Sequence, residues 1–233
     1  MKQKASIFDV DGTLSRGFYI VKFSEALNEE GLFSQEELEA TRKFFAEYGK
    51  NTNYSYKQFA WDLVNSFGRG IEGKKQLDIE NAGKRYLELH DDKFEYTKEI
   101  IKFAKARNYR TAVISGSPLE IILPFSKSLE IADTFATTFK TKNGIFTREV
   151  IQNCALNETK RQIIERYFRE NDIDPNSSIG FGDSHHDLAF LEMVKYPVAL
   201  NPNVKLEQIA KERGWLICRE NEQVLDSVKL YIA

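Results

Sequence analysis

A short apolar run that ends in two aspartates constrains this chain more than any other stretch. Residues 5–8 predict a buried strand, and Asp9 and Asp11 follow where that strand should end. In an open α/β sheet, ligands bind outside the carboxyl ends of the strands. Two acids at such a place repel each other unless a cation or a proton offsets their charge. The stretch therefore predicts a metal ion at a strand end.

Strand and helix patterns alternate over most of the chain. Further strands are expected at residues 109–114, 178–182, 197–200 and 215–218, with a hairpin of short strands within 135–151. Helices are expected between them, at residues 93–107, 119–129 and 158–170, and again after Asp183 and after Asn201. This alternation is typical of a parallel sheet with helices on both faces. The predicted fold class is therefore α/β.

Residues 16–87 interrupt the alternation with helical patterns alone. Ser34 begins a capping-box pattern, Ser-x-x-Glu, and a loop is expected at 49–53. No β-branched, strand-like run breaks this region. We therefore expect an α/β core domain of residues 1–15 and 88–233, with an all-helical cap domain of residues 16–87 inserted over the strand ends.

The composition narrows the class of protein. The chain has 233 residues, a net charge of −2 and a pI of about 6.0, so it has no basic field for a nucleic acid. No apolar run approaches the ~20 residues of a membrane span, and residues 1–4 lead into a strand rather than a signal peptide. Cys154 and Cys218 are expected to be reduced, buried thiols of a cytoplasmic protein. The sequence carries no signal for an oligomeric state.

Four motifs fall at the ends of the core strands or at a helix start beside them. They are Asp9-Val10-Asp11-Gly12-Thr13-Leu14, Ile114-Ser115-Gly116, Lys160, and Gly182-Asp183-Ser184-His185-His186-Asp187. In this order they resemble the motifs of the haloacid dehalogenase (HAD) superfamily of phosphotransferases. The stretch at 201–215 and the helical insertion further resemble subfamily IB, which includes phosphoserine phosphatase. One DxDGT match would be suggestive, whereas four motifs in order are very specific.

The resemblance implies a Rossmannoid core and a phosphatase that hydrolyses a small-molecule phosphate monoester. Asp9 would attack phosphorus to give an aspartyl-phosphate. Asp11 would protonate the leaving oxygen and later deprotonate the attacking water. Mg²⁺ would bind the carboxylates of Asp9 and Asp183 and the backbone carbonyl of Asp11.

The resemblance also assigns the groups around the phosphate. The Ser115 hydroxyl and the Gly116 amide would bind phosphoryl oxygens, and Gly12 would let the chain turn beside them. Lys160 would place its charge against the phosphate and the nucleophile. Asp187 would orient a metal-bound water or Lys160.

Some of these residues have competing interpretations. Lys140 and Lys142 are rivals of Lys160, which is favoured because it lies in the first turn of a helix as the family motif does. Ser115 and Asp187 have an alternative role as plain helix caps.

The insertion carries the candidates for substrate contacts. Phosphoserine phosphatases of the subfamily bind the substrate ammonium group with a Glu at the position of Phe18. Phe18 therefore argues against phosphoserine and favours an apolar or aromatic leaving group. Arg16, Phe18 and Tyr19 are the candidate substrate residues. Possible contacts for a second anionic group are Arg16, Lys22, Arg42 and Arg69.

The remaining aromatic and imidazole side chains are interpreted structurally. Phe59, Trp61 and Phe67 are expected in the core of the insertion. Tyr54 and Tyr56 lie at a loop and could face the substrate, although a structural role is favoured. His185 and His186 are expected to be loop or mouth residues, because Mg²⁺ prefers oxygen ligands.

Other functions on the same scaffold are open at this point. A dehalogenase would lack the second acid, so Asp11 speaks against it. A phosphomutase or other phosphotransferase shares these motifs, and a phosphate-binding protein that has lost turnover is a further alternative.

Overall fold

The structure is a computed structural model that describes residues 2–48, 50 and 53–233. Three positions of the loop expected at 49–53, namely 49, 51 and 52, lie outside the described residues.

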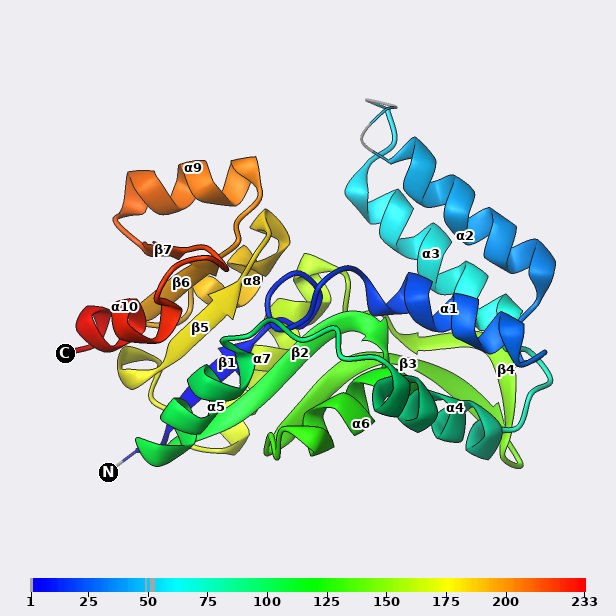
Figure 1. The fold of residues 1–233 in the computed structure, drawn as a ribbon, viewed down its shortest axis with the longest axis horizontal. Coiled ribbons are helices and arrows are strands. Elements are labelled where there is room, and N and C mark those ends of the chain that lie inside the picture. Colours follow the sequence, from blue (N-terminus) through cyan, green and yellow to red (C-terminus); the bar gives the residue numbers. More distant parts are fainter. Residues whose placement is uncertain (1, 49, 51–52) are drawn as a thin grey trace.

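A seven-stranded sheet forms the centre of the molecule, in the order β4-β3-β2-β1-β5-β6-β7 (Figure 1). Its strands are β1 (Lys4–Phe8), β2 (Tyr109–Pro118), β3 (Asp133–Lys142), β4 (Ile145–Gln152), β5 (Ile179–Gly182), β6 (Tyr196–Leu200) and β7 (Leu216–Cys218). Every neighbouring pair is parallel except β3 and β4, which form the expected hairpin. Phe8 lies in register with Val113 of β2 and Phe181 of β5, so the carboxyl ends of these three strands meet.

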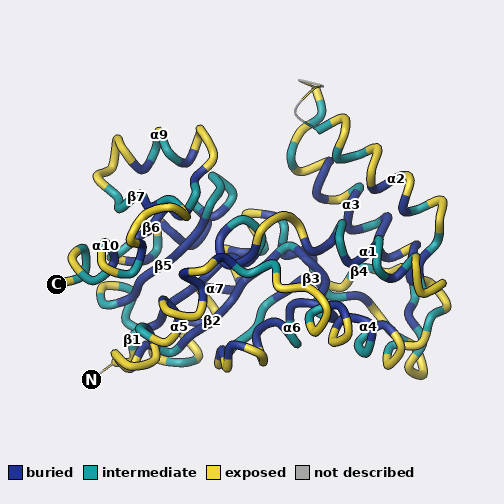
Figure 2. Tube along the Cα trace, viewed as in Figure 1, coloured by how far each residue is buried: buried dark blue, intermediate teal, exposed yellow. Residues whose placement is uncertain are grey.

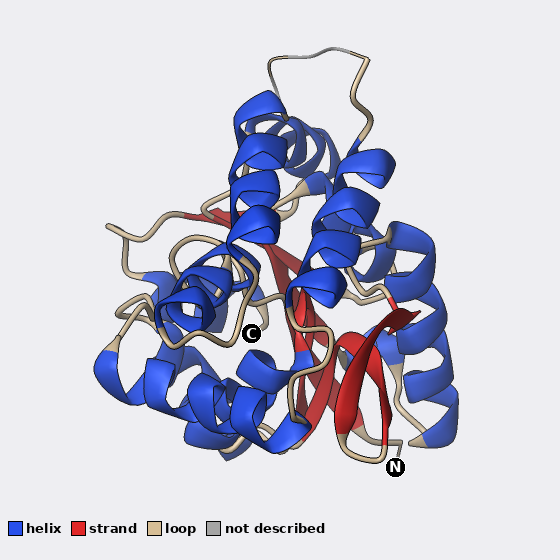
Figure 3. Cartoon of the chain, turned by 90° about the vertical axis from the view of Figure 1, so that its right-hand side faces the viewer, coloured by secondary structure: helices blue, strands red, loops and turns tan. Residues whose placement is uncertain are grey.

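Helices cover both faces of the sheet, as the side view in Figure 3 shows. They are α5 (Thr97–Ala106), α6 (Leu119–Ser128), α7 (Asn157–Glu170), α8 (Leu188–Leu191), α9 (Val204–Arg213) and α10 (Val224–Tyr231). Side chains alternate along a strand, so β1 serves both faces. Ala5 and Ile7 pack with α7, α8 and α9, whereas Phe8 belongs to the cluster with α5, α6 and α10. Figure 2 shows β1, β2, β5 and β6 as mostly buried, whereas β3 and β4 are only partly buried. The predicted α/β fold class is confirmed.

The insertion between β1 and α5 contains four helices. They are α1 (Tyr19–Glu29), α2 (Gln35–Glu47), α3 (Tyr56–Gly70) and α4 (Gln76–Leu89). Helices α1, α2 and α3 stand over the end of the sheet near β3 and β4, whereas α4 lies beside α6 (Figure 1). A Cβ atom on Gly83 of α4 would lie 2.2 Å from the carbonyl oxygen of Glu120 in α6. The insertion therefore packs against a side of the core as well as over the strand ends, and its division into a separate domain of residues 16–87 stays a prediction.

Two local expectations differ from the structure, and one helix was not expected. The helix expected from residue 93 begins at Thr97, because the chain first pairs with the segment that leaves β1: Lys93 bridges Ser15. Ser34 does accept a hydrogen bond from the Glu37 amide, but the Glu37 carboxylate bonds Ser66 and Arg69, so the reciprocal half of the capping box does not form. Helix α10 was not predicted from the sequence.

No helix in the described part of the chain combines the length and the apolar character needed to cross a membrane.

Candidate active site

The end of β1 turns tightly, which positions the first pair of acids. The Asp9 amide donates to the carbonyl oxygen of Phe181, and the amides of residues 13–15 all donate to the carbonyl oxygen of Val10. Gly12 has a φ of +86°, and a Cβ atom there would lie 2.4 Å from Asp183 Oδ2. Glycine is therefore required at this position by backbone conformation and by space.

Lys160 connects two of the other predicted residues. Its Nζ lies 2.8 Å from Asp9 Oδ1 and 2.7 Å from Asp187 Oδ1. Lys160 is buried in the first turn of α7. Its rivals lie elsewhere, because Lys140 pairs with Glu149 on the surface and Lys142 is exposed in the hairpin. Of the three lysines, the structure brings only Lys160 to the acids.

Asp183 and Asp187 reach the same place from the end of β5. Asp187 Oδ2 accepts hydrogen bonds from the amide and the hydroxyl of Ser184, which holds this turn in shape. Asp183 Oδ1 accepts a hydrogen bond from Thr13 Oγ1 at 3.4 Å. One carboxylate oxygen from each of Asp9, Asp183 and Asp187 lies within 4.8 Å of the others.

The charges at this place do not balance within the described residues. Burial raises the pKa of Asp9 well above its ordinary range, although Lys160 acts in the opposite direction. Burial likewise raises the pKa of Asp183, and the nearby charge of Asp187 adds to the effect. Burial alone would lower the pKa of Lys160, but Asp187 and Asp9 outweigh it and raise this pKa. One ammonium group thus faces a surplus of carboxylates. A hard divalent cation with oxygen ligands fits such a donor set.

Asp11 links the core to the insertion. Its Oδ1 accepts a hydrogen bond from the Tyr19 amide at 2.7 Å, and its Oδ2 accepts from the hydroxyls of Ser115 and Ser117 at 2.9 and 2.8 Å. Ser117 Oγ in turn accepts from the Ile20 amide at 3.0 Å. Burial raises the pKa of Asp11, while these hydrogen bonds act in the opposite direction.

These contacts also explain how helix α1 begins. Its N-cap residue, Phe18, has no side-chain oxygen to accept from the first amides of the helix. Asp11 and Ser117 take that role from the core. Ser117 was missed in the sequence, and its only signal was a second serine directly after the Ser115-Gly116 motif.

A cavity of about 420 Å³ opens above these residues, and its two walls differ. Core residues form one wall, which includes Asp9, Asp11, Gly116, Ser117, Lys160, Asp183 and Asp187. The insertion forms the other wall, which includes Phe18, Phe45, Tyr48, Tyr56, Phe59 and Leu63. The cavity can therefore hold a phosphate group against the core and an apolar group against the insertion.

Several aromatic predictions need correction. Tyr56 lines the cavity, where its ring stacks on His186 and its hydroxyl donates to the Ala155 carbonyl oxygen. Trp61 is partly exposed and lies outside the core of the insertion. Both errors have one cause, because the rotation of α3 about its axis depends on contacts with β4 that helical spacing does not reveal.

His185 and His186 line the cavity beside Asp183.

The basic candidates of the insertion do not line the cavity. Arg16 pairs with Glu220 and donates to the Lys93 carbonyl oxygen at 2.6 Å. The others also have acidic partners: Lys22 pairs with Asp92, Arg42 with Glu25, and Arg69 with Glu37.

Two of the three candidate substrate side chains are also directed elsewhere. The Tyr19 ring is buried against Phe125, so Tyr19 reaches the site through its backbone amide only. Phe18 lines the cavity, whereas Arg16 does not.

A family model described as haloacid dehalogenase-like hydrolase matches residues 7–192. The chain belongs to this family.

Two curated relatives are phosphatases. Phosphoserine phosphatase SerB1 of Mycobacterium tuberculosis is 25% identical over 227 residues, which cover 91% of this chain and 70% of that protein. The histidinol-phosphatase of Neisseria meningitidis serogroup C is 26% identical over 216 residues, which cover 90% of this chain and 96% of that protein. The predicted enzyme class, a phosphoric monoester hydrolase of the HAD family, is confirmed.

Solved structures share the fold. A protein of unknown function from Bordetella pertussis Tohama I gives a TM-score of 0.79 at 17% identity and covers 94% of this chain and 100% of its own. A substrate-bound phosphoserine phosphatase complex gives 0.69 at 21% identity and covers 99% of both chains. The predicted Rossmannoid core is confirmed by these likenesses.

Proposed function

We propose that the protein is a Mg²⁺-dependent phosphatase that hydrolyses a small-molecule phosphate monoester through a phosphoryl group on Asp9. The observation that carries this proposal is the buried contact between Asp9 Oδ1 and Lys160 Nζ, at 2.8 Å, on the floor of a cavity. A buried carboxylate is a poor nucleophile when it is protonated. The ammonium group beside it favours its ionised form.

Asp9 attacks phosphorus, the bond to the leaving oxygen breaks, and Asp11 donates a proton to that oxygen. Water then attacks the phosphoryl group on Asp9, and Asp11 removes its proton. Free alcohol and phosphate leave, and Asp9 is regenerated. The amide of Gly116 lies in the core wall as a donor for phosphoryl oxygens, and the Ser115 hydroxyl, which donates to Asp11 in this structure, would turn to act as a second donor.

The carboxylates of Asp9 and Asp183, with the backbone carbonyl of Asp11, would hold Mg²⁺. When bound, this ion neutralises phosphate charge and offsets the repulsion between the acids. Asp187 is engaged by Lys160 and Ser184, which supports a role in orienting Lys160.

The location and the partners belong to the same proposal. A cavity of about 420 Å³ suits a small metabolite rather than a nucleic acid. The buried, unpaired thiols of Cys154 and Cys218 are compatible with the cytoplasmic location that the sequence predicts.

The test is phosphate release from p-nitrophenyl phosphate with Mg²⁺, with EDTA, and with the Asp9→Asn variant. Turnover is expected with Mg²⁺ alone and neither with EDTA nor with the variant. Turnover that survives in Asp9→Asn would overturn the mechanism. Release of free phosphate, rather than a rearranged ester, separates this reaction from that of a phosphomutase.

A further inference from the structure

We propose that the cavity selects phosphate monoesters of uncharged alcohols that carry an aromatic ring, and rejects esters that carry an amino or carboxylate group. This inference rests on the proposed function, because it concerns the leaving group of the same reaction. It commits to a chemistry that differs from that of serine, whose phosphate ester carries both charges.

The charge of the insertion wall is the first argument. Among the described residues, no acidic or basic side chain of α1–α4 lines the cavity. The basic residues of α1–α3 that the sequence singled out are held by Asp92, Glu25 and Glu37 on the outside. A substrate ammonium or carboxylate that entered beside this wall would lose water and find no partner on it, which is costly.

The aromatic character of this wall is the second argument. The rings of Tyr48 and Phe59 stack at 4.1 Å, and Phe45 meets Phe59 edge to face at 5.1 Å. Phe18 extends the same series, because its ring lies 5.2 Å from that of Phe45. A further ring placed here gains both apolar burial and aromatic contacts.

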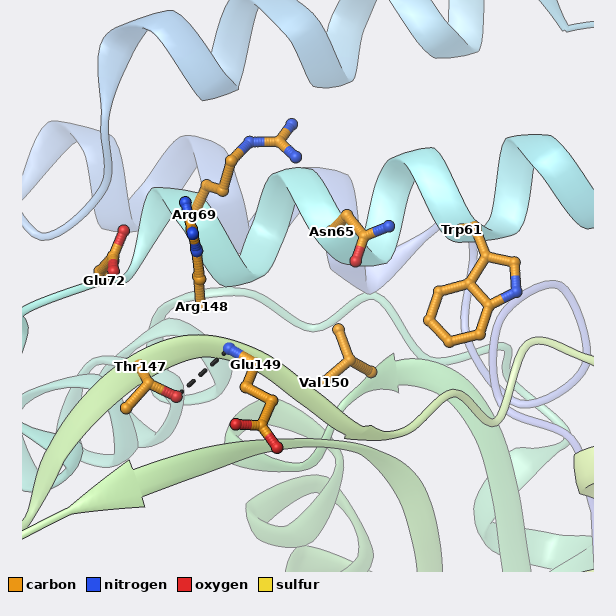
Figure 4. A pocket seen from close by; sticks show the side chains of 8 residues that line it. All are labelled: Trp61, Asn65, Arg69, Glu72, Thr147, Arg148, Glu149 and Val150. Carbon is orange, nitrogen blue, oxygen red and sulfur yellow. Dashed lines mark hydrogen bonds between the residues drawn. The ribbon is translucent and has the colours of Figure 1, made fainter.

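The two faces of helix α3 differ, which shows that the lack of charged side chains is confined to the side that faces the cavity. Phe59 and Leu63, four residues apart, line the cavity, as one helical face should. Trp61 and Asn65 lie on the other face, in an outer groove opposite Val150 of β4 (Figure 4). That groove also contains Arg69, Glu72, Arg148 and Glu149. Charged groups are thus abundant on the outer side of α3 and missing from its cavity side.

The core wall accounts for the one charged group that such a substrate carries, its phosphate. Lys160 faces Asp9 at the floor, and the imidazoles of His185 and His186 also line this wall. A phosphate group is expected to occupy that floor. The rest of the substrate then faces the aromatic wall.

The experiment compares four esters of primary alcohols, whose leaving groups are similar: 3-phenylpropyl phosphate, propyl phosphate, phosphoethanolamine and phosphoserine. We expect kcat/KM for 3-phenylpropyl phosphate to exceed that for each of the other three by about 10²-fold. Equal or faster turnover of phosphoserine or propyl phosphate would overturn the inference. So would turnover of p-nitrophenyl phosphate without turnover of 3-phenylpropyl phosphate.

Failure of the proposed function has a different signature. In that case none of the esters, p-nitrophenyl phosphate included, would release phosphate in a manner that depends on Asp9. If the four esters have similar kcat/KM values and their turnover depends on Asp9, the proposed specificity is wrong and the proposed function stands.

Variants assign the selection to the wall. Phe45 is half-buried, so Phe45→Ala should fold, and it should reduce the preference for 3-phenylpropyl over propyl phosphate about 10-fold. Trp61→Ala removes a larger ring from the outer face of the same insertion and should leave that ratio unchanged. Phe18→Glu should shift the ratio of phosphoethanolamine to propyl phosphate upward, because it adds a carboxylate at the wall. Each readout is a ratio within one variant, so a partly unfolded sample does not change it. An unchanged ratio in Phe45→Ala would contradict the assignment.

Discussion

The two walls of the cavity differ in charge and in their place in the chain. The core wall carries mainly polar groups at strand ends and helix starts: acids, one lysine, serine hydroxyls, two imidazoles and an asparagine. The insertion wall consists of rings and aliphatic side chains on helix faces. Strand ends hold polar groups in a rigid array, which suits the chemistry of phosphoryl transfer. Helix faces can change their side chains without disturbing that array, which suits selection of the leaving group.

The two regions are nevertheless joined at two places. Asp11 and Ser117 of the core accept hydrogen bonds from the first amides of α1, so the proposed general acid and the insertion share one hydrogen-bond network. Gly83 of α4 packs directly on the backbone of Glu120 in α6. The comparison therefore concerns two surfaces of one packed molecule, and substitutions can address each surface separately.

The largest expected effect comes from removing the proposed proton donor of the core wall. Asp11→Asn should lower kcat/KM, which reports the steps up to release of the alcohol, by about 10²–10⁴ for an alkyl phosphate, because the alkoxide then leaves without a proton. The loss should be much smaller for p-nitrophenyl phosphate, whose phenolate leaves unaided. Asp226→Asn, at an exposed acid paired with Lys229, should change neither rate. An equal loss for both substrates would contradict the role of general acid.

The next effect concerns the lysine of the core wall. Lys160→Met should lower kcat/KM by about 10²–10³ for all phosphate esters alike, since the charge acts on the phosphoryl group. Lys140→Met is the matched control and should leave kcat/KM unchanged, because Lys140 pairs with Glu149 on the surface. A large loss in the Lys140 variant, with activity kept in the Lys160 variant, would reverse the assignment.

The smallest effect is expected where α4 of the insertion packs on α6 of the core, and it concerns stability rather than rate. Glu120 is buried beside α4, its Oε2 has no hydrogen-bond partner among the described residues, and burial raises its pKa from 4.5 to about 7. The unfolded chain therefore loses this proton at a lower pH than the folded chain. Stability should fall as the pH rises from about 4.5 to 7 and then level off.

Removal of this charge gives the test. Glu120→Gln should raise the free energy of unfolding above pH 7 by roughly 2–3 kcal/mol relative to the native chain, and should have little effect near pH 4. Denaturant unfolding at both pH values measures it. Glu99→Gln, at an exposed glutamate in the first turn of α5, is the control. A gain of the same size at both pH values would show that the charge is not the cause.

The sequence predicted most of the acids and the lysine of the core wall because these residues lie next to buried strands, whereas it missed Ser117. Asp9, Asp11 and Asp183 follow β1 and β5 directly, and parallel strands bring their carboxyl ends to one edge. Lys160 followed from its place in the first turn of α7. Position along the chain therefore determined position in space.

The insertion wall could not be predicted in the same way. Helical spacing does not show which side of a helix faces a neighbouring element. It therefore predicts a structural role for Tyr56, which lines the cavity, and a core position for Trp61, which is exposed. The contact of Ser117 with Ile20 spans 97 residues and depends on how α1 meets β2. Helix α10 was missed because it follows the last strand as a short segment with polar flanks.

Detection of the phosphoryl group on Asp9 tests the central claim most directly. The enzyme is mixed with an excess of a turned-over ester, quenched in acid within one turnover and digested with pepsin at low pH, which preserves an acyl phosphate. The account predicts one additional phosphoryl group on the peptide that contains Asp9, located at Asp9 by fragmentation and absent from Asp9→Asn. An active enzyme that gives no phosphorylated peptide, or one labelled at Asp11, would contradict it.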